Sequence, residues 1–228
     1  MLLQLTNIIK EYQHKEGKVF ALDNVSLSVN EGDFVVVTGA SGSGKTTLLL
    51  IIGGLLYASS GEMKYEGIPI SLQGGMELDH YRKSQVGFVM QNFALIPYLT
   101  AKENVLLAMH SKKPTNAEKS SQAEKLLNMV GLEHRMSHYP KELSAGQQQR
   151  VAIARALANS PSIILADEPT GNLDPNLSKD ILELLKKINA EEGTTIIMVT
   201  HSEIAVGYGR THIRLENGHV VGASTIPQ

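Results

Sequence analysis

The fold of this chain is decided by the stretch Phe34-Val35-Val36-Val37-Thr38-Gly39-Ala40-Ser41-Gly42-Ser43-Gly44-Lys45-Thr46-Thr47, where a continuously apolar segment enters a glycine-rich turn. A short apolar run of this kind is typical of a strand that is covered on both faces. From Gly39 to Thr46 the turn matches the spacing of a phosphate-binding loop, and a helical pattern follows over residues 45–56. Strand, loop and helix in this order are the context that the motif requires.

The chemistry that this loop predicts is phosphate binding. Glycines allow backbone N–H groups to surround phosphate oxygens at a helix N-terminus, where the helix dipole favours an anion. We expect Lys45 to reach the β- and γ-phosphates of a nucleotide and the Thr46 hydroxyl to bind Mg²⁺. The predicted phosphate-binding residues are Gly39, Ser41, Gly42, Ser43, Gly44, Lys45, Thr46 and Thr47.

A second motif places two carboxylates after an apolar run. Residues 163–166 are Ile-Ile-Leu-Ala, and Asp167 and Glu168 follow directly. Acids in this position lie at the carboxyl edge of a sheet, where ligands bind in open α/β folds. We expect Asp167 to hold Mg²⁺ and Glu168 to polarise the attacking water as a general base. Considered alone, such a pair is more typical of a solvated loop start, but beside a phosphate-binding loop the catalytic interpretation is favoured.

Composition narrows the classes of partner. The 228 residues carry 21 Lys and Arg against 23 Asp and Glu, a net charge of −2, with no cysteine. This balance predicts no nucleic-acid partner, since such proteins usually carry a basic stripe. The longest apolar run, residues 48–56, is well short of the roughly 20 residues that span a bilayer, so membrane association is expected only through a partner chain.

The remaining patterns predict an α/β fold. Alternating apolar residues before residue 30 indicate an antiparallel β subdomain, and the strand–helix–strand order of 163–166, 177–188 and 194–199 indicates a mostly parallel core sheet. Asn217-Gly218 predicts a closing hairpin. Residues 91–160 look helical, most clearly over 118–130 and 147–158. We expect one domain, 1–228, with a P-loop NTPase core (about 1–90 and 161–228) and an inserted α-helical subdomain (about 91–160).

One further segment indicates which class of phosphate-loop protein this chain is similar to. Leu143-Ser144-Ala145-Gly146-Gln147, followed by Gln148-Gln149-Arg150-Val151-Ala152, closely resembles the signature motif of ABC ATPases, with Ala145 in place of the usual second glycine. Ser144, Gly146 and Gln147 would form a second anion site at a helix start. The same residues also predict a capping box, with Ser144 as N-cap and Gln147 three residues later. The two interpretations are compatible.

The resemblance implies roles for residues that are weak signals alone. Gln91 matches the glutamine that senses Mg²⁺ and the γ-phosphate, and residues 171–174, which end at Asp174, match the D-loop. His201 matches the switch histidine, although Ser202 stands where the family usually has aspartate. Tyr12 matches the aromatic residue that stacks on adenine, with Phe20 as a competitor. The implied catalytic residues are therefore Glu168, His201 and Gln91, and the implied metal site is Thr46, Gln91 and Asp167.

The resemblance covers nearly the whole chain and is greatest to the subgroup of lipoprotein release, macrolide efflux, peptide-antibiotic resistance and cell division. It rests on residues 96–105, on 165–174 and on the phosphate-binding loop. It implies ATP and Mg²⁺ as ligands and a head-to-tail dimer of two copies that sandwiches ATP. It also implies permease subunits on separate chains, which hold this chain on the cytoplasmic face of the membrane.

Two other functions are alternatives to that of a transport or extraction ATPase. One is the ATPase of a transmembrane signalling complex that regulates cell-wall hydrolases. The other, a soluble ABC protein of DNA repair or translation, needs long coiled coils or paired nucleotide domains, for which 228 residues leave no room. The expected contact with the membrane partner is a groove near Gln91 to Tyr98, in which Phe93, Leu95 and Ile96 are either docking residues or simply buried.

Overall fold

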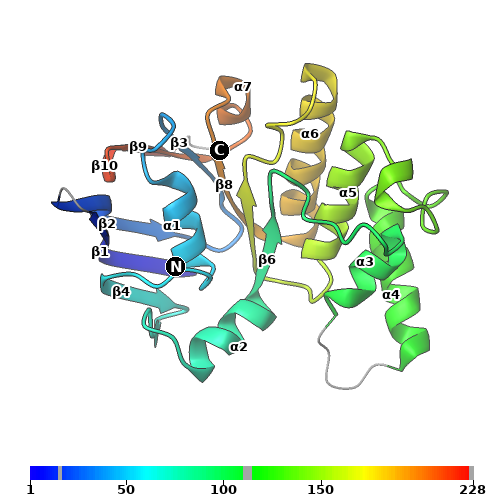
Figure 1. Ribbon diagram of the computed structural model, residues 1–228, viewed down its shortest axis with the longest axis horizontal. Helices are drawn as coiled ribbons and strands as arrows, with labels where there is room; N and C mark the ends of the chain where they lie inside the picture. Colours follow the sequence, from blue (N-terminus) through cyan, green and yellow to red (C-terminus); the bar gives the residue numbers. More distant parts are fainter. Residues whose placement is uncertain (15–16, 110–114, 226–228) are drawn as a thin grey trace.

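The structure is a computed structural model that describes residues 1–14, 17–109 and 115–225, and two β-sheets organise it (Figure 1). The first sheet holds four strands in the order β2-β1-β4-β5, all antiparallel. Their bounds are β1 Leu3–His14, β2 Gly17–Val29, β4 Ser60–Tyr65 and β5 Ile68–Ile70. This sheet confirms the predicted N-terminal antiparallel subdomain. Residues 15–16, between β1 and β2 in the sequence, lie outside the described residues.

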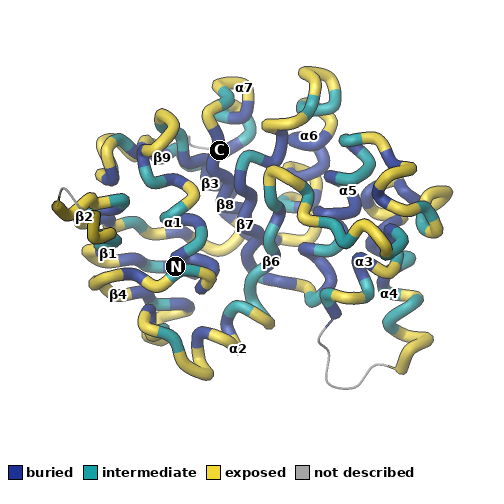
Figure 2. Tube along the Cα trace, viewed as in Figure 1, coloured by how far each residue is buried: buried dark blue, intermediate teal, exposed yellow. Residues whose placement is uncertain are grey.

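The second sheet is the core of the molecule. Its strand order is β10-β9-β3-β8-β7-β6, with β10 antiparallel to β9 and the other neighbours parallel. The bounds are β3 Phe34–Thr38, β6 Val86–Val89, β7 Ile163–Asp167, β8 Thr195–Thr200, β9 Thr211–Glu216 and β10 His219–Thr225. Every residue of β7 and β8 is buried, as the apolar runs predict (Figure 2). The mostly parallel α/β core is therefore confirmed.

Helices cover this sheet on both faces. Their bounds are α1 Lys45–Ile52, α2 Met76–Gln85, α3 Ala101–Leu107, α4 Asn116–Met129, α5 Ala145–Ala156, α6 Pro175–Glu192 and α7 Glu203–Val206, with a 3₁₀ turn at Pro140–Glu142. In the described residues no helix has both the length and the apolar character needed to cross a bilayer. The helices predicted over 118–130, 147–158 and 177–188 correspond to α4, α5 and α6.

Helix α1 is shorter than the pattern over 45–56 predicts, because it ends at Ile52. A Cβ atom on Gly53 would lie 1.9 Å from the ring of Phe88, and Gly54 has a φ of 66°. The two glycines therefore allow close packing on β6 and turn the chain away from the helix axis. This tertiary contact ends a helix that the apolar periodicity alone would continue.

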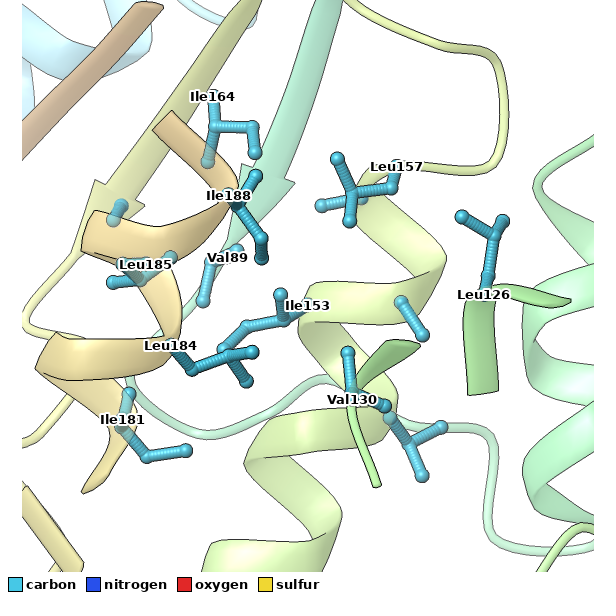
Figure 3. Packing of buried hydrophobic residues seen from close by; sticks show 14 of the residues in the cluster. Val89, Leu126, Val130, Ile153, Leu157, Ile164, Ile181, Leu184, Leu185 and Ile188 are labelled. Carbon is cyan, nitrogen blue, oxygen red and sulfur yellow. The ribbon is translucent and has the colours of Figure 1, made fainter. Parts of the chain in front are cut away.

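Two buried clusters join these layers. One packs α1 between the antiparallel sheet and one face of the core sheet. The other lies on the opposite face of the core sheet, where Val89 and Ile164 meet the apolar sides of α5 and α6 (Figure 3). The same cluster continues to Leu126 and Val130 at α4. One continuous apolar cluster therefore includes residues before and after position 91, where the helical subdomain is predicted to begin. It packs the helical segment against the core sheet.

Candidate functional site

The loop between β3 and α1 needs glycine at two positions. Gly39 and Gly44 have φ angles of 156° and 100°, in a region that L side chains rarely adopt. A Cβ atom on Gly39 would lie 2.2 Å from the Leu215 carbonyl oxygen, and one on Gly44 would lie 2.3 Å from the carbonyl oxygen of Ala21. The backbone of the loop is thus pressed against its neighbours, and the start of α1 is left open on the other side.

Lys45 folds back over this loop. Its Nζ atom donates to the carbonyl oxygens of Gly39 and Ala40, each at 2.8 Å. The side chain is buried, so its charge lies at the centre of the turn rather than in solvent. Close by, the Ser43 hydroxyl is buried with no hydrogen-bond partner among the described residues. A cation and an unpaired hydroxyl at a helix start suit an anion of several oxygens.

Thr46 and Asp167 form the second part of the site. The Thr46 hydroxyl donates to Oδ1 of Asp167 at 3.0 Å and so joins the first turn of α1 to the end of β7. Burial raises the pKa of Asp167 above its ordinary value, against the lowering effects of Thr46 and Lys45. A hydroxyl and a carboxylate are hard oxygen ligands, and Mg²⁺ typically adds waters and phosphate oxygens to such a pair. The donor set therefore fits Mg²⁺ together with a nucleotide.

Glu168 and His201 meet at the same edge of the sheet. Glu168 has a φ of 46°, which turns its side chain out of the line of β7. Its Oε1 atom lies 2.9 Å from Nδ1 of His201, and its Oε2 atom accepts from the backbone N–H of His201 at 3.4 Å. The Glu168 side chain is only 14% exposed, whereas that of His201 is 69% exposed. A sheltered carboxylate is thus held by an imidazole that solvent and ligands can reach.

Lys45, Thr46, Glu168 and His201 line one cavity of about 600 Å³, whereas Asp167 is outside the cavity wall and contacts it through its hydrogen bond with Thr46. Its walls are Ala21, Ser41, Gly42, Gly44, Lys45, Thr46, Thr47, Gln91, Glu168 and His201. A cavity of this size is in the range of small-molecule sites. Gly39 and Ser43 line an adjoining hollow of about 680 Å³ that shares Ser41, Gly42 and His201 with the first. The fold thus brings the phosphate-binding loop, Gln91, Glu168 and His201 together from four separate segments.

Gln91 is held in this wall by two residues of the turn after β7. Nδ2 of Asn172 donates to the backbone oxygen of Gln91 at 2.9 Å. A Cβ atom on Gly171 would lie 2.8 Å from Nε2 of Gln91, so the absence of a side chain there leaves room for the glutamine amide. Sequence reasoning did not find this support, since the contact spans 81 positions and no local pattern predicts it.

The signature segment lies outside the cavity. Ser144 is the N-cap of α5, accepts from the backbone N–H of Gln147 at 3.3 Å, and donates its own N–H to Oε1 of Gln147 at 3.0 Å. The predicted capping box is confirmed. Ser144, Gly146 and Gln147 are absent from the cavity wall. Helix α5 also lies on the opposite side of β6 from α1 (Figure 1).

Asp174 and Tyr12 also lie away from the cavity wall. The Asp174 side chain caps α6 by accepting from the backbone N–H groups of Asn176 and Leu177. Tyr12 lies in β1, is 44% exposed, and has the ammonium of Lys10 at 5.0 Å from its ring centre. Neither residue lines the cavity. The nucleotide contacts expected of both stay predictions.

The segment expected to meet a membrane partner is anchored by a buried amide that sequence reasoning did not single out for a role. Asn104, fully buried, accepts from the N–H of Ile96 at 2.8 Å and donates to the carbonyl oxygens of Ile96, Leu99 and Thr100. Leu95 packs on the apolar cluster below, whereas Tyr98 is 76% exposed. Within this segment Leu95 therefore supports the turn from below, whereas Tyr98 is on the surface.

Known proteins resemble this chain over nearly its whole length. The ABC transporter family model matches residues 22–171. An uncharacterised ABC transporter ATP-binding protein of Methanocaldococcus jannaschii is 46% identical over 220 residues, which cover 96% of this chain and 98% of the relative. The lipoprotein-releasing system ATP-binding protein LolD of Syntrophotalea carbinolica is 42% identical and covers 97% of each chain. The ATP-binding cassette MJ0796, solved as a post-hydrolysis dimer with ADP and Pi, has a TM-score of 0.91 at 42% identity over 100% of both chains.

Proposed function

This chain is an ATP-binding and ATP-hydrolysing subunit of the ABC transporter family, and we propose that two copies close head to tail around two ATP molecules to move separate membrane subunits. One observation carries the proposal. The cavity wall contains the phosphate-binding loop, Glu168 and His201, yet none of residues 144–147 lines it. This separation supports the proposal that the anion site at the start of α5 binds a phosphate held by another copy of the chain.

The nucleotide site divides its work among the residues of the cavity. The loop N–H groups and Lys45 bind the β- and γ-phosphates of ATP, with Thr47 as a further donor. Thr46 and Asp167 would hold Mg²⁺, with Gln91 beside them, and the bound ion would supply charge neutralisation at the phosphates. Glu168 accepts a proton from the attacking water, since its carboxylate lies at the cavity wall and is sheltered from solvent. His201 orients Glu168 and approaches the γ-phosphate from the exposed side.

The second copy completes the site from the other side. Ser144, Gly146 and Gln147 at the start of α5 present N–H groups and a helix dipole to the γ-phosphate held by the partner. Asp174, at the start of α6, faces the same interface. The dimeric form of MJ0796 supports this arrangement, because that cassette is similar to the present chain over its whole length. Tyr12 stacks on the adenine of the bound nucleotide.

The membrane partner is a separate permease, and it holds the chain on the cytoplasmic face of the membrane. The LolD relatives belong by name to lipoprotein-releasing systems, which supports extraction or transport as the task of the complex. The proposed contact surface is the segment 91–98, which extends from Gln91 in the cavity wall to the exposed Tyr98. Closure of the dimer would move this segment and the permease with it.

The absence of cysteine from the sequence allows a clean test of the head-to-tail dimer. One preparation of the protein carries Ser41→Cys and a second carries Ala145→Cys, each in the Glu168→Gln background. The two preparations are mixed with ATP. We expect an ATP-dependent disulfide between the two variants and little cross-linking in either preparation alone. Equal cross-linking of each variant with itself, or none with ATP, would refute the head-to-tail arrangement. Purification with the native membrane subunit then separates a transport ATPase from the signalling alternative.

A further inference from the structure

The turn that follows β6 is strained at two successive residues. Phe93 and Ala94 have φ angles of 60° and 47°, although neither is glycine. The left-handed region brings Cβ close to the following carbonyl oxygen, so non-glycine residues occupy it only when their surroundings require it. Two local hydrogen bonds help to hold this conformation. Phe93 N–H donates to the Met90 oxygen at 3.0 Å, and Ala94 N–H donates to the Asn92 oxygen at 2.6 Å.

Arg155 supplies the long-range contact that holds this turn. Its Nη2 atom donates to the Phe93 carbonyl oxygen at 2.8 Å, and its Nη1 atom donates to the Ala94 carbonyl oxygen. A guanidinium presents two parallel N–H groups in a fixed plane, which suits two successive carbonyl groups. We call these two hydrogen bonds the Arg155 clamp. It joins the last turn of α5 to a loop more than 60 positions earlier in the chain.

The charge of Arg155 strengthens the clamp. Among the ion pairs of the described residues none includes Arg155, so its hydrogen bonds to the two carbonyl groups are not shared with a carboxylate at salt-bridge distance. Burial lowers the pKa of Arg155 from its ordinary value, which means that the guanidinium has lost part of its hydration. Hydrogen bonds from a charged donor are stronger in such surroundings.

The clamped turn begins at a residue of the nucleotide cavity. Gln91 lies in the cavity wall, and the amide of Asn172 holds its backbone oxygen at 2.9 Å. Two positions later the Arg155 clamp holds the next part of the turn from the side of α5. Ser144 is the N-cap of that helix, so one helix links the signature segment to the turn that positions Gln91.

We propose that Arg155 is a positioning residue for ATP hydrolysis, because its two hydrogen bonds hold the strained turn at Phe93 and Ala94 and so keep Gln91 at the cavity wall. The inference rests on the proposed role of Gln91 beside Mg²⁺. A basic residue in the last turn of a helix also stabilises the helix dipole, which is the purely structural alternative. That alternative predicts a loss of stability with no effect on the chemistry of the folded protein.

The first test replaces the guanidinium. ATP hydrolysis is measured for Arg155→Met and Arg155→Lys at increasing ATP and increasing Mg²⁺, below the melting temperature of each variant. We expect kcat of Arg155→Met to fall about tenfold and the Mg²⁺ concentration for half-maximal rate to rise several-fold. Lysine should recover part of the loss, since a single ammonium cannot hold both oxygens in a fixed plane. A lower melting temperature with unchanged kcat and unchanged Mg²⁺ dependence would overturn the proposal.

The second test changes the backbone strain directly, by substitution of the exposed Ala94, whose carbonyl group accepts from Arg155. Glycine tolerates a positive φ, so Ala94→Gly added to Arg155→Met should restore kcat several-fold. A β-branched residue resists this conformation, so Ala94→Val should lower kcat even with Arg155 intact. The valine variant keeps the proposal testable if Arg155→Met does not fold. No rescue by glycine, together with no loss in the valine variant, would contradict it.

Hydrogen exchange separates this proposal from the role of Gln91. Faster exchange of the Phe93 and Ala94 amides in Arg155→Met, or in Ala94→Val, is expected if the clamp holds the turn, and unchanged exchange would refute the clamp. Gln91→Ala tests the other assignment, because wild-type kcat in that variant would remove Gln91 from the reaction. The two failures are therefore distinguishable.

Discussion

Nδ1 of His201 lies 2.9 Å from Oε1 of Glu168, although the two residues are 33 positions apart. Glu168 directly follows β7 and His201 directly follows β8, and these strands are parallel neighbours in the core sheet. Parallel neighbours end at the same edge of a sheet, so the register places the two side chains together. The pair combines a sheltered carboxylate with an exposed imidazole at the wall of the nucleotide cavity.

If Glu168 is the general base, Glu168→Gln should bind ATP and form a stable dimer with turnover reduced by about a hundredfold or more. Glutamine preserves the shape of the side chain but cannot accept the proton of the attacking water. Size-exclusion chromatography with ATP and a phosphate-release assay measure the two effects. Glu191→Gln, at an exposed carboxylate of α6, is the matched control. Wild-type turnover in Glu168→Gln would assign the base to another group.

Lys45→Ala should weaken ATP binding by about a hundredfold or more, because it removes the buried cation of the loop. Titration calorimetry with ATP measures the affinity, and circular dichroism checks that the variant is folded. Lys179→Ala, at an exposed lysine of α6, removes an equal charge outside the site. Unchanged affinity in Lys45→Ala would overturn the assignment of this loop to the phosphates.

Asp167→Asn should raise the free energy of unfolding at pH 7 in the absence of nucleotide and abolish hydrolysis. Burial raises the pKa of Asp167, so the folded state holds its proton more tightly than the unfolded state. Ionisation therefore costs stability as pH rises through the folded pKa, and asparagine avoids that cost. The gain should shrink toward pH 4, where the carboxyl group is increasingly neutral in both states.

Urea unfolding at both pH values measures this gain, with the exposed Asp180→Asn as control. A destabilised Asp167→Asn at pH 7, or a gain that does not depend on pH, would show that ionised Asp167 is not costly in the folded chain.

Gly44→Ala should destabilise the chain by about 3 kcal/mol, whereas Gly42→Ala should cost only about 1 kcal/mol. Both residues have a positive φ, but only at Gly44 would a Cβ atom meet the backbone, at 2.3 Å from the Ala21 oxygen. At Gly42 nothing lies within 4 Å. Thermal unfolding of the two variants separates backbone strain from steric exclusion. Equal costs would mean that the loop moves away from Ala21 without penalty.

Local patterns account for most of the fold that could be predicted from the sequence. Apolar runs predict β3, β7 and β8, because strands buried on both faces need apolar residues at every position. The end of α1 lies before the one that the apolar pattern predicts, since the contact of Gly53 with Phe88 joins residues 35 positions apart in the chain. Periodicity carries no information about such a contact.

The sequence by itself determined the phosphate-binding loop, the carboxylate pair at Asp167 and Glu168, and the capped start of α5, because each depends on residues that are neighbours in the chain. Only the tertiary structure decided what supports Gln91, what holds the strained turn at Phe93 and Ala94, and that residues 144–147 lie outside the cavity. The register of parallel strands and the packing of α5 on the sheet set those relationships. Both arise from the burial of apolar side chains that are far apart in the sequence.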